Sequence, residues 1–362
     1  MANVGYIISR ELRRKGIDVD LLMNKNPASY SDPLVFDPEL KGKYPNWIKF
    51  YDTSKPFWKI EIVRTMRNKK YDLIHAHVEL PIFAYVSRRP YIAQVLGSDI
   101  RELAFENSLK GWLLRRAYKK AQAILFYEPL DPHLLQELNL NTGIHIPVMW
   151  DTSFFKPMKQ DMNEFQNRFV IFHPANLDWR LKGNDILIKG FAKFVDFHPH
   201  SKLLIVDRGI DSKKTHDLVN SLNFNKDQVM FVKGPLSYSL LLDYYNKSDV
   251  VADQFVLDGI GNIGAETFSC EKPLLTYCTP DTYGELYSEP PPAVNAHTPD
   301  EIAKQLEILL DERRRLQVGK EGRIWMLKYR SPEVISQKII QTYKMILDNY
   351  PIKNIKDKVE KW

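Results

Sequence analysis

The stretch Asp258-Gly-Ile-Gly-Asn-Ile-Gly-Ala-Glu266, followed by Thr-Phe-Ser-Cys-Glu-Lys-Pro273, decides how the chain is interpreted. Gly259 and Gly261 stand just before a predicted helix, where glycine lets the backbone approach a ligand and free N–H groups favour an anion. Glu266 is the only charged residue of that predicted helix. A buried carboxylate needs a partner, and it can accept two hydrogen bonds from sugar hydroxyls. The residues alone leave a salt bridge to a neighbouring strand as an equal alternative.

Short apolar segments alternate with predicted helices on both sides of this stretch, which is typical of a parallel sheet covered by helices. In the C-terminal half, strands are predicted at 169–172, 203–206, 229–232, 250–252 and 274–277, and helices at 184–194, 213–222, 236–246, 262–270 and 299–310. In the N-terminal half, strands are predicted at 18–22, 47–51, 73–77, 92–96 and 124–127, and helices at 3–15, 56–68 and 108–121.

We therefore predict an α/β protein with two Rossmann-like, doubly wound parallel-sheet domains facing a cleft. The first domain spans 1–163 and is completed by 331–362, whose helix crosses back to it; the second spans 164–330. Ligands of such sheets bind beyond the carboxyl ends of the strands. A doubly wound domain normally has its first strand at its centre, but only Met1 and Ala2 precede the first predicted helix. We expect no strand before Asn3.

A second candidate anion site lies between His173 and Gly183, a segment that follows a strand and opens a helix. Arg180 and Lys182 stand there, where a helix dipole repels cations unless an anion is bound or the side chains swing outward. A diphosphate would form charge-assisted bonds to both residues. Two solvated surface cations are the other interpretation.

Polar residues also follow two strands of the N-terminal half. His75 and His77 alternate on one strand and point to one face. A metal site would need a third ligand, such as Glu79, and no further cluster is evident, so we expect polar contact and no metal. Ser98 and Asp99 follow the next strand, where a helix cap and a substrate contact are both open.

The composition excludes several classes of protein. The 362 residues, 44% of them hydrophobic and 27% charged, suit two globular domains. Two cysteines exclude a disulfide scaffold or a four-cysteine zinc site, and with no evident signal peptide or membrane-spanning stretch we expect a cytoplasmic protein. The net charge of +6 by itself selects no partner, and the basic residues are not interleaved with aromatic ones as in a nucleic-acid platform.

Two basic amphipathic segments, 108–121 and 352–362, have apolar residues at helical spacing. Either segment could rest on an anionic membrane surface, which would make the protein peripheral to the inner membrane face. The alternative is that both are helices that face the core and expose their charged side to water.

Taken in order along the chain, five motifs resemble those of the retaining GT-B glycosyltransferases of the glycosyl transferases group 1 family. The motifs are Asp72–His77, Gly97–Asp99, Ile146-Pro147 leading to Asp151 and Phe155, Lys182-Gly183, and Asp258–Glu266 with Lys272-Pro273. The resemblance covers nearly the whole chain and implies the GT-B fold. It implies transfer of a sugar from a nucleoside diphosphate to a hydroxyl acceptor, which could be a glycan, a lipid-linked sugar or a small molecule.

The resemblance also assigns roles to residues. Glu266 would bind the ribose hydroxyls, and Lys182 with Arg180 would neutralise the diphosphate. Asp258 would face the sugar, beside the donor-binding backbone of Gly259, Ile260, Gly261 and Asn262. His75, His77, Ser98 and Asp99 would lie on the acceptor side, with acceptor recognition in loops such as 24–46. No metal and no other cofactor is implied.

The chain departs from the family pattern at several of these positions. Asp258 stands where the family prefers glutamate, Leu177 where an arginine usually accompanies the lysine, and Leu96 where many members have a histidine. These departures leave two other hypotheses open. One is a nucleotide-binding scaffold protein without transfer activity, and the other is a GT-B epimerase that acts on the nucleotide sugar itself.

Overall fold

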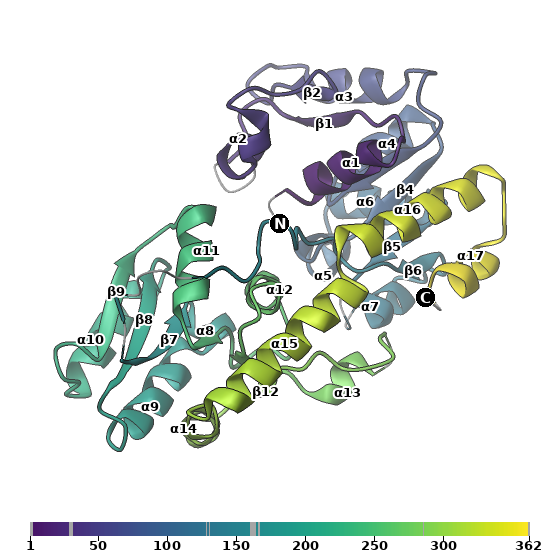
Figure 1. The fold of residues 1–362 in the computed structure, drawn as a ribbon. Coiled ribbons are helices and arrows are strands. Elements are labelled where there is room, and N and C mark those ends of the chain that lie inside the picture. The colour runs from purple at the N-terminus through teal and green to yellow at the C-terminus, as the bar shows by residue number, and fades with distance from the viewer. Residues whose placement is uncertain are drawn as a thin grey trace. The chain divides into compact units, whose positions relative to one another are not determined.

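The computed structural model describes residues 3–28, 32–127, 129, 131–159, 164–165, 167–284 and 286–360. The chain divides into two compact units (Figure 1): unit 1 contains Met1–Trp150 and Tyr329–Trp362, and unit 2 contains Asp151–Lys328. The expected domain boundaries, after 163 and after 330, differ from these divisions after Trp150 and Lys328. The C-terminal segment that was expected to return to the first domain is part of unit 1.

Unit 1 contains two parallel sheets. One pairs β1 (Leu21–Asn24) with β2 (Ile48–Tyr51), and the other has the order β3 (Ile74–His77), β4 (Tyr91–Gln94), β5 (Ile124–Phe126) and β6 (Gly143–His145). Among the described residues, no strand pairing joins the two sheets. Strand β1 lies slightly later in the chain than the predicted strand at 18–22. The expectation about strands before Asn3 concerns Met1 and Ala2, which lie outside the described residues.

The helices of unit 1 cover these sheets. They are α1 (Val4–Arg14), α2 (Pro33–Phe36), η2 (Pro38–Leu40), α3 (Trp58–Met66), α4 (Pro81–Ser87), α5 (Ser98–Arg101), η3 (Leu103–Phe105), α6 (Leu109–Lys120), α7 (Asp131–Glu137), α16 (Pro332–Leu347) and α17 (Ile352–Val359). Helices α1 and α16, far apart in the sequence, share one hydrophobic core with strands β4, β5 and β6. Ser331 caps α16 by accepting a hydrogen bond from Val334 N, as the Ser-Pro signal predicts.

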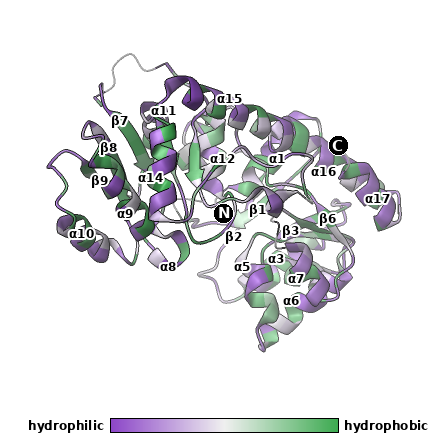
Figure 2. Cartoon of the chain, turned by 90° about the horizontal axis from the view of Figure 1, so that it is seen from below, coloured by the Kyte–Doolittle hydropathy of each residue, from purple (hydrophilic) through white to green (hydrophobic). Residues whose placement is uncertain are grey.

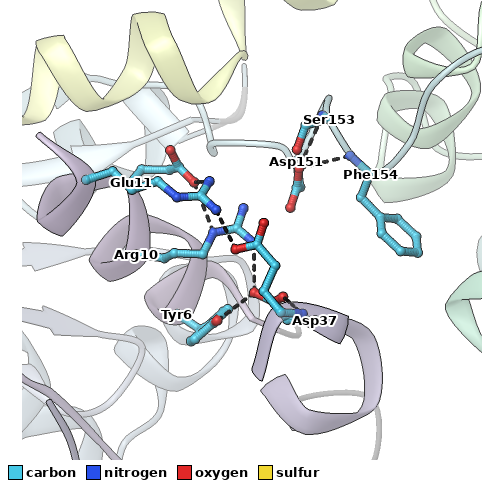
Figure 3. Close-up of polar contacts among 9 residues, drawn as sticks. Tyr6, Arg10, Glu11, Asp37, Asp151, Ser153 and Phe154 are labelled. Atoms are coloured by element: carbon cyan, nitrogen blue, oxygen red, sulfur yellow. Dashed lines mark hydrogen bonds and ion pairs between the residues drawn. The ribbon is translucent and has the colours of Figure 1, made fainter. Parts of the chain in front are cut away.

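The segment that contains α2 and η2 is held on α1 by a buried carboxylate (Figure 3). Asp37 is 4% exposed and accepts hydrogen bonds from the Tyr6 hydroxyl, at 2.6 Å, and from Arg10 Nη1, at 2.9 Å. Its other oxygen accepts a hydrogen bond from Glu39 N. Part of the 24–46 loop is therefore anchored on the first helix, whereas residues 29–31 lie outside the described residues.

Unit 2 is built on one parallel sheet with the order β12-β11-β10-β7-β8-β9. Its strands are β7 (Phe169–His173), β8 (Ser201–Asp207), β9 (Val229–Lys233), β10 (Val250–Ala252), β11 (Leu274–Thr276) and β12 (Val294–Asn295). Its helices are α8 (Trp179–Lys182), α9 (Asn184–Val195), α10 (Ser212–Ser221), α11 (Tyr238–Lys247), α12 (Asn262–Ser269), α13 (Pro280–Tyr283), α14 (Pro299–Ile308) and α15 (Glu312–Tyr329, whose last residue belongs to unit 1).

The hydropathy of the residues in unit 2 differs between its sheet and its helices. Strands β7 and β8 are coloured as hydrophobic in Figure 2, whereas α14 shows both colours, as expected for helices with one face on the sheet. The strand order reverses between β7 and β10, because β8 and β9 lie on one side of β7 and β10 to β12 on the other. Such a reversal leaves a crevice at the carboxyl ends of the two central strands, where open α/β sheets bind ligands.

Candidate functional site

The residues that follow β7 and β10 form the candidate site in unit 2. Strand β7 leads into α8, which ends at Lys182, and β10 leads directly into Asp253 and Gln254. The ammonium group of Lys182 lies 2.6 Å from Oε1 of Gln254 and 3.5 Å from Oδ1 of Asp253. The topology thus brings together one cation and two acceptors at the point where the strand order reverses.

The structure adds one helical turn to the sequence prediction at this point. Arg180 and Lys182 were expected just before the helix predicted at 184–194; they lie in the single turn of α8, which Gly183 separates from α9. Gly183 has a φ of 64°, a conformation that favours glycine. Gly183 is also the N-cap of α9, so Lys182 directly precedes a helix N-terminus, where the helix dipole disfavours a cation unless an anion is bound. Arg180 is exposed and, among the described residues, has no hydrogen bond or ion pair.

The glycine loop lies against α13. Gly259 has a φ of 131°, and a side chain there would start 2.9 Å from the Tyr283 hydroxyl, which accepts a hydrogen bond from Ile260 N. Helix α12 begins after Gly261 without a side-chain cap, so its first N–H groups are available to an anion. Asn262 is the first residue of α12.

Asp258 lies at the exposed edge of this loop. Its carboxylate accepts hydrogen bonds from Thr279 N and Oγ1, at 2.9 and 2.6 Å, and from Thr282 Oγ1 at 2.7 Å. These three bonds hold the loop against the start of α13. Both oxygens of the carboxylate are therefore engaged within unit 2.

Glu266 is buried on α12, with 7% of its surface exposed. Its partner is the hydroxyl of Tyr245 on α11, which donates to Oε2 at 2.5 Å, and among the described residues Glu266 has no ion pair. Burial raises the pKa of Glu266 to about 7; the nearby Asp253 adds to this, whereas the Tyr245 hydrogen bond and Arg208 oppose it. Within the described ranges, the alternative salt bridge from Glu266 to a neighbouring strand is not found.

Four residues of this site were not singled out from the sequence. Asp253 and Gln254 come directly after a predicted strand, the position where parallel sheets present ligand groups, and this signal could have found them. Tyr245 carries no such signal, because it is one of several apolar residues on a predicted helix. Arg208 follows β8, is exposed, and donates to the carbonyl oxygen of Pro174 at 3.5 Å.

The two histidines of unit 1 pack against each other on β3. Their ring centroids are 4.5 Å apart, and Nδ1 of His75 lies 2.6 Å from the Tyr343 hydroxyl on α16. Burial lowers the pKa of His75 well below its usual value and that of His77 to about 4. Among the described residues, no cluster of three or more His, Cys, Asp or Glu side chains is arranged to hold a metal ion.

Asp99 is committed to the local fold of unit 1. It is 2% exposed, its Oδ1 accepts a hydrogen bond from Leu96 N at 3.0 Å, and its Oδ2 accepts one from the Tyr118 hydroxyl at 2.9 Å. Burial raises its pKa. The preceding Ser98 is exposed at the start of α5. The two neighbouring residues thus differ, since only Ser98 is open to solvent.

The two basic segments, 108–121 and 352–362, differ in how far their apolar side chains are exposed. On α6, Leu109 is 73% and Trp112 46% exposed, whereas on α17 Ile355 and Val359 are each 1% exposed and belong to the core of unit 1. Lys361 and Trp362 of the second segment lie outside the described residues. No helix within the described ranges has the length and apolar character needed to cross a membrane.

Two family models match the chain. The model for Glycosyltransferase Family 4 matches residues 1–129, and the model for Glycosyl transferases group 1 matches residues 155–325. No curated protein matches the chain significantly.

Solved structures share the fold at low sequence identity. HepE (Alr3699) of Anabaena, solved with UDP and glucose, has a TM-score of 0.73 at 15% identity over 95% of this chain and 96% of its own. Sucrose-phosphate synthase of Thermosynechococcus elongatus has a TM-score of 0.68 at 17% identity, over 95% of this chain and 92% of its own. A glycosyltransferase of Rickettsia africae has a TM-score of 0.68 at 13% identity, over 96% and 95%.

The two family matches together take in most of the chain, and the similar structures are glycosyltransferases with two Rossmann-like domains. The chain therefore belongs to the glycosyl transferases group 1 family and has the GT-B fold.

Proposed function

We propose that this protein is a retaining glycosyltransferase that moves a sugar from a nucleoside diphosphate to a hydroxyl acceptor without a metal ion. The observation that supports this most strongly is the placement of Lys182 and Glu266 in one unit, around the reversal point of its sheet. A cation and a buried carboxylate are the two groups that a nucleoside diphosphate requires, one for its phosphates and one for its ribose.

The ammonium of Lys182 would act on the leaving group. Negative charge grows on the diphosphate as the bond to the sugar breaks, and a fixed cation stabilises that charge more than it stabilises the bound donor. The free N–H groups at the start of α12 would add to the same effect. Asp258 would orient the sugar, with its three hydrogen bonds to Thr279 and Thr282 fixing its position.

Glu266 would bind the ribose of the nucleotide. Oε2 of Glu266 is occupied by Tyr245, and among the described residues Oε1 has no hydrogen-bond partner, which leaves it to accept a hydrogen bond from a ribose hydroxyl. A UDP-sugar is the first donor to test, because the similar HepE structures contain UDP and UDP-glucose.

The proposal is tested first by measuring nucleotide binding and then by measuring sugar transfer. Thermal shifts with UDP, GDP, ADP and TDP identify the base, since a ligand specific for the folded state raises the melting temperature. The matching nucleotide sugars are then assayed for nucleotide release with Lys182→Ala and Glu266→Ala. We expect both variants to lose activity, while full activity in both would overturn the proposal.

A nucleotide-binding scaffold protein is the second candidate, because both oxygens of Asp258 are already hydrogen-bonded within the loop. Such a protein would bind nucleotide but transfer no sugar to any acceptor. Detection of one glycosylated product excludes it, and product analysis without acceptor detects an epimerase.

We also propose that unit 1 contacts an anionic membrane surface through α6 and not through the C-terminal segment. The exposed Leu109 and Trp112 lie on a helix that also exposes Arg116, Lys119 and Lys120, whereas Ile355 and Val359 of α17 are buried. We expect sedimentation with phosphatidylglycerol vesicles but not with phosphatidylcholine vesicles, and loss of sedimentation in Trp112→Ser. The matched control is Leu316→Ser, at a 65% exposed position of α15. Equal sedimentation of both variants would contradict the proposal.

A further inference from the structure

One side chain connects the lysine of the site to its glycine loop. Nε2 of Gln254 donates hydrogen bonds to the carbonyl oxygens of Leu257, at 3.0 Å, and Gly259, at 3.1 Å. Only the NH₂ group of an amide can donate, so these two bonds fix which way the amide points. Its oxygen, Oε1, consequently faces the Lys182 ammonium at 2.6 Å.

The backbone around Gln254 is equally well held. Its carbonyl oxygen accepts hydrogen bonds from Tyr277 N at 2.7 Å and from Thr276 Oγ1 at 2.9 Å, and the residue is 7% exposed. The next residue, Phe255, donates its N–H to the carbonyl oxygen of Lys182 at 2.9 Å. The amide therefore extends from a rigid base that also contacts the lysine backbone.

Asp253 lies on another side of the same ammonium. It is 1% exposed, and its Oδ1 lies 3.5 Å from Lys182 Nζ. Its Oδ2 has no hydrogen-bond partner among the described residues and lies 3.8 Å from where a side chain on Gly261 would begin. A buried carboxylate depends on a nearby cation, so Asp253 also holds the ammonium in place. Within the described part of the chain, the lysine has one N–H group left for a ligand.

We propose that Gln254 is a positioning residue: its amide fixes the Lys182 ammonium and the loop 257–259 to each other, so that lysine and loop meet an anion as one unit. The proposed function enters only in the identity of that anion, the diphosphate of a nucleotide. Donors held in place before binding need no reorganisation when the charge arrives, which is why such a link strengthens anion binding. Glutamine suits the task because its side chain both donates and accepts.

Two substitutions separate the two halves of this link. Gln254→Met has a similar length but neither donates nor accepts, so it releases both the lysine and the loop. Gln254→Glu keeps an acceptor for Lys182 but has no donor for Leu257 and Gly259. If Gln254 only supported the loop, the two substitutions would change the reactivity of Lys182 in the same way.

The first experiment needs no ligand. Acetylation of lysine side chains by acetic anhydride is followed by mass spectrometry, with Lys189, a surface residue of α9, as the internal reference. We expect Lys182 to react several-fold faster in Gln254→Met than in the wild type, and no faster than in the wild type in Gln254→Glu, because a carboxylate beside it stabilises the unreactive ammonium. An unchanged Lys182 rate in Gln254→Met would overturn the proposal.

The second experiment measures UDP affinity by calorimetry in a double-mutant cycle of Gln254→Met and Lys182→Met. We expect Gln254→Met to weaken binding about 10-fold in the wild type and by a smaller factor in the Lys182→Met background, where only its hold on the loop is lost. If the double variant loses affinity by the full product of the two single-variant factors, the proposal is overturned. Thermal unfolding of each variant monitors folding. If the wild type binds no UDP, the donor assignment has failed, and the acetylation rates still decide the role of Gln254.

Discussion

The hydroxyl of Tyr245 donates a hydrogen bond of 2.5 Å to Oε2 of Glu266, and this bond joins α11 to α12. Both residues are buried, and among the described residues no cation pairs with the carboxylate. The tyrosine therefore provides the hydrogen bond that makes a buried glutamate tolerable at this position.

Replacing Tyr245 by phenylalanine removes that hydrogen bond and leaves the carboxylate without its donor. We expect the free energy of unfolding at pH 8 to fall by about 1–3 kcal/mol, because a buried acceptor loses its partner. Urea unfolding measures the change. Tyr244→Phe is the matched control, since the neighbouring ring stacks on Phe172 and its hydroxyl has no hydrogen bond among the described residues. Equal losses in the two variants would contradict this role of Tyr245.

The raised pKa of Glu266 predicts a pH dependence of stability. An ordinary glutamate titrates near 4.5 and this one at about 7, so between these values the folded protein holds a proton that the unfolded chain has released. Stability from this group is full below about pH 4.5 and is lost as the pH rises through 7.

The measurement compares wild type with Glu266→Gln, which does not titrate. We expect the unfolding free energy of wild type, relative to the variant, to decrease between pH 4.5 and 7 by up to about 1.4 kcal/mol per pH unit. Curves that run parallel across this range would show that Glu266 has an ordinary pKa.

The sequence predicted most of unit 2, because strands β7 to β11 contain short apolar runs and the long helices between them have an apolar face. Strand β12, with two residues, was not predicted. The short helix α8 was not predicted, because four residues of helix are too few to show a period. Lys182 and Glu266 could be singled out by their spacing and surroundings. Their contacts with Gln254 and Tyr245 could not, since these depend on crossovers that bring distant segments together.

Unit 1 was less predictable. Helices α4 and α7 and strand β6 were not predicted, because segments this short do not establish a period. Asp99 shows the same limit at the level of one residue. Its position after a strand was compatible with a substrate contact, and only the packing of α6 brings Tyr118 to its carboxylate.

Asp99 and Ser98 offer a matched pair of substitutions. We expect Asp99→Ala to lower the free energy of unfolding by about 1–3 kcal/mol, because Leu96 N and the Tyr118 hydroxyl lose their acceptor. Ser98→Ala, at an exposed position, is expected to change it by no more than about 0.5 kcal/mol. Chemical denaturation of both variants tests this, and a stable Asp99→Ala protein would return Asp99 to the list of candidate substrate contacts.

Lys182 and Glu266 are the two residues that we propose to bind a nucleoside diphosphate in unit 2. Calorimetric titration of UDP, or of whichever diphosphate gives the largest thermal shift, tests this proposal most directly, with Lys182→Ala and Glu266→Ala against the surface controls Lys189→Ala and Glu307→Ala. We predict that the two site variants bind at least about 10-fold more weakly than wild type and that the controls bind as wild type does. Wild-type affinity in both site variants would show that neither Lys182 nor Glu266 binds the nucleotide.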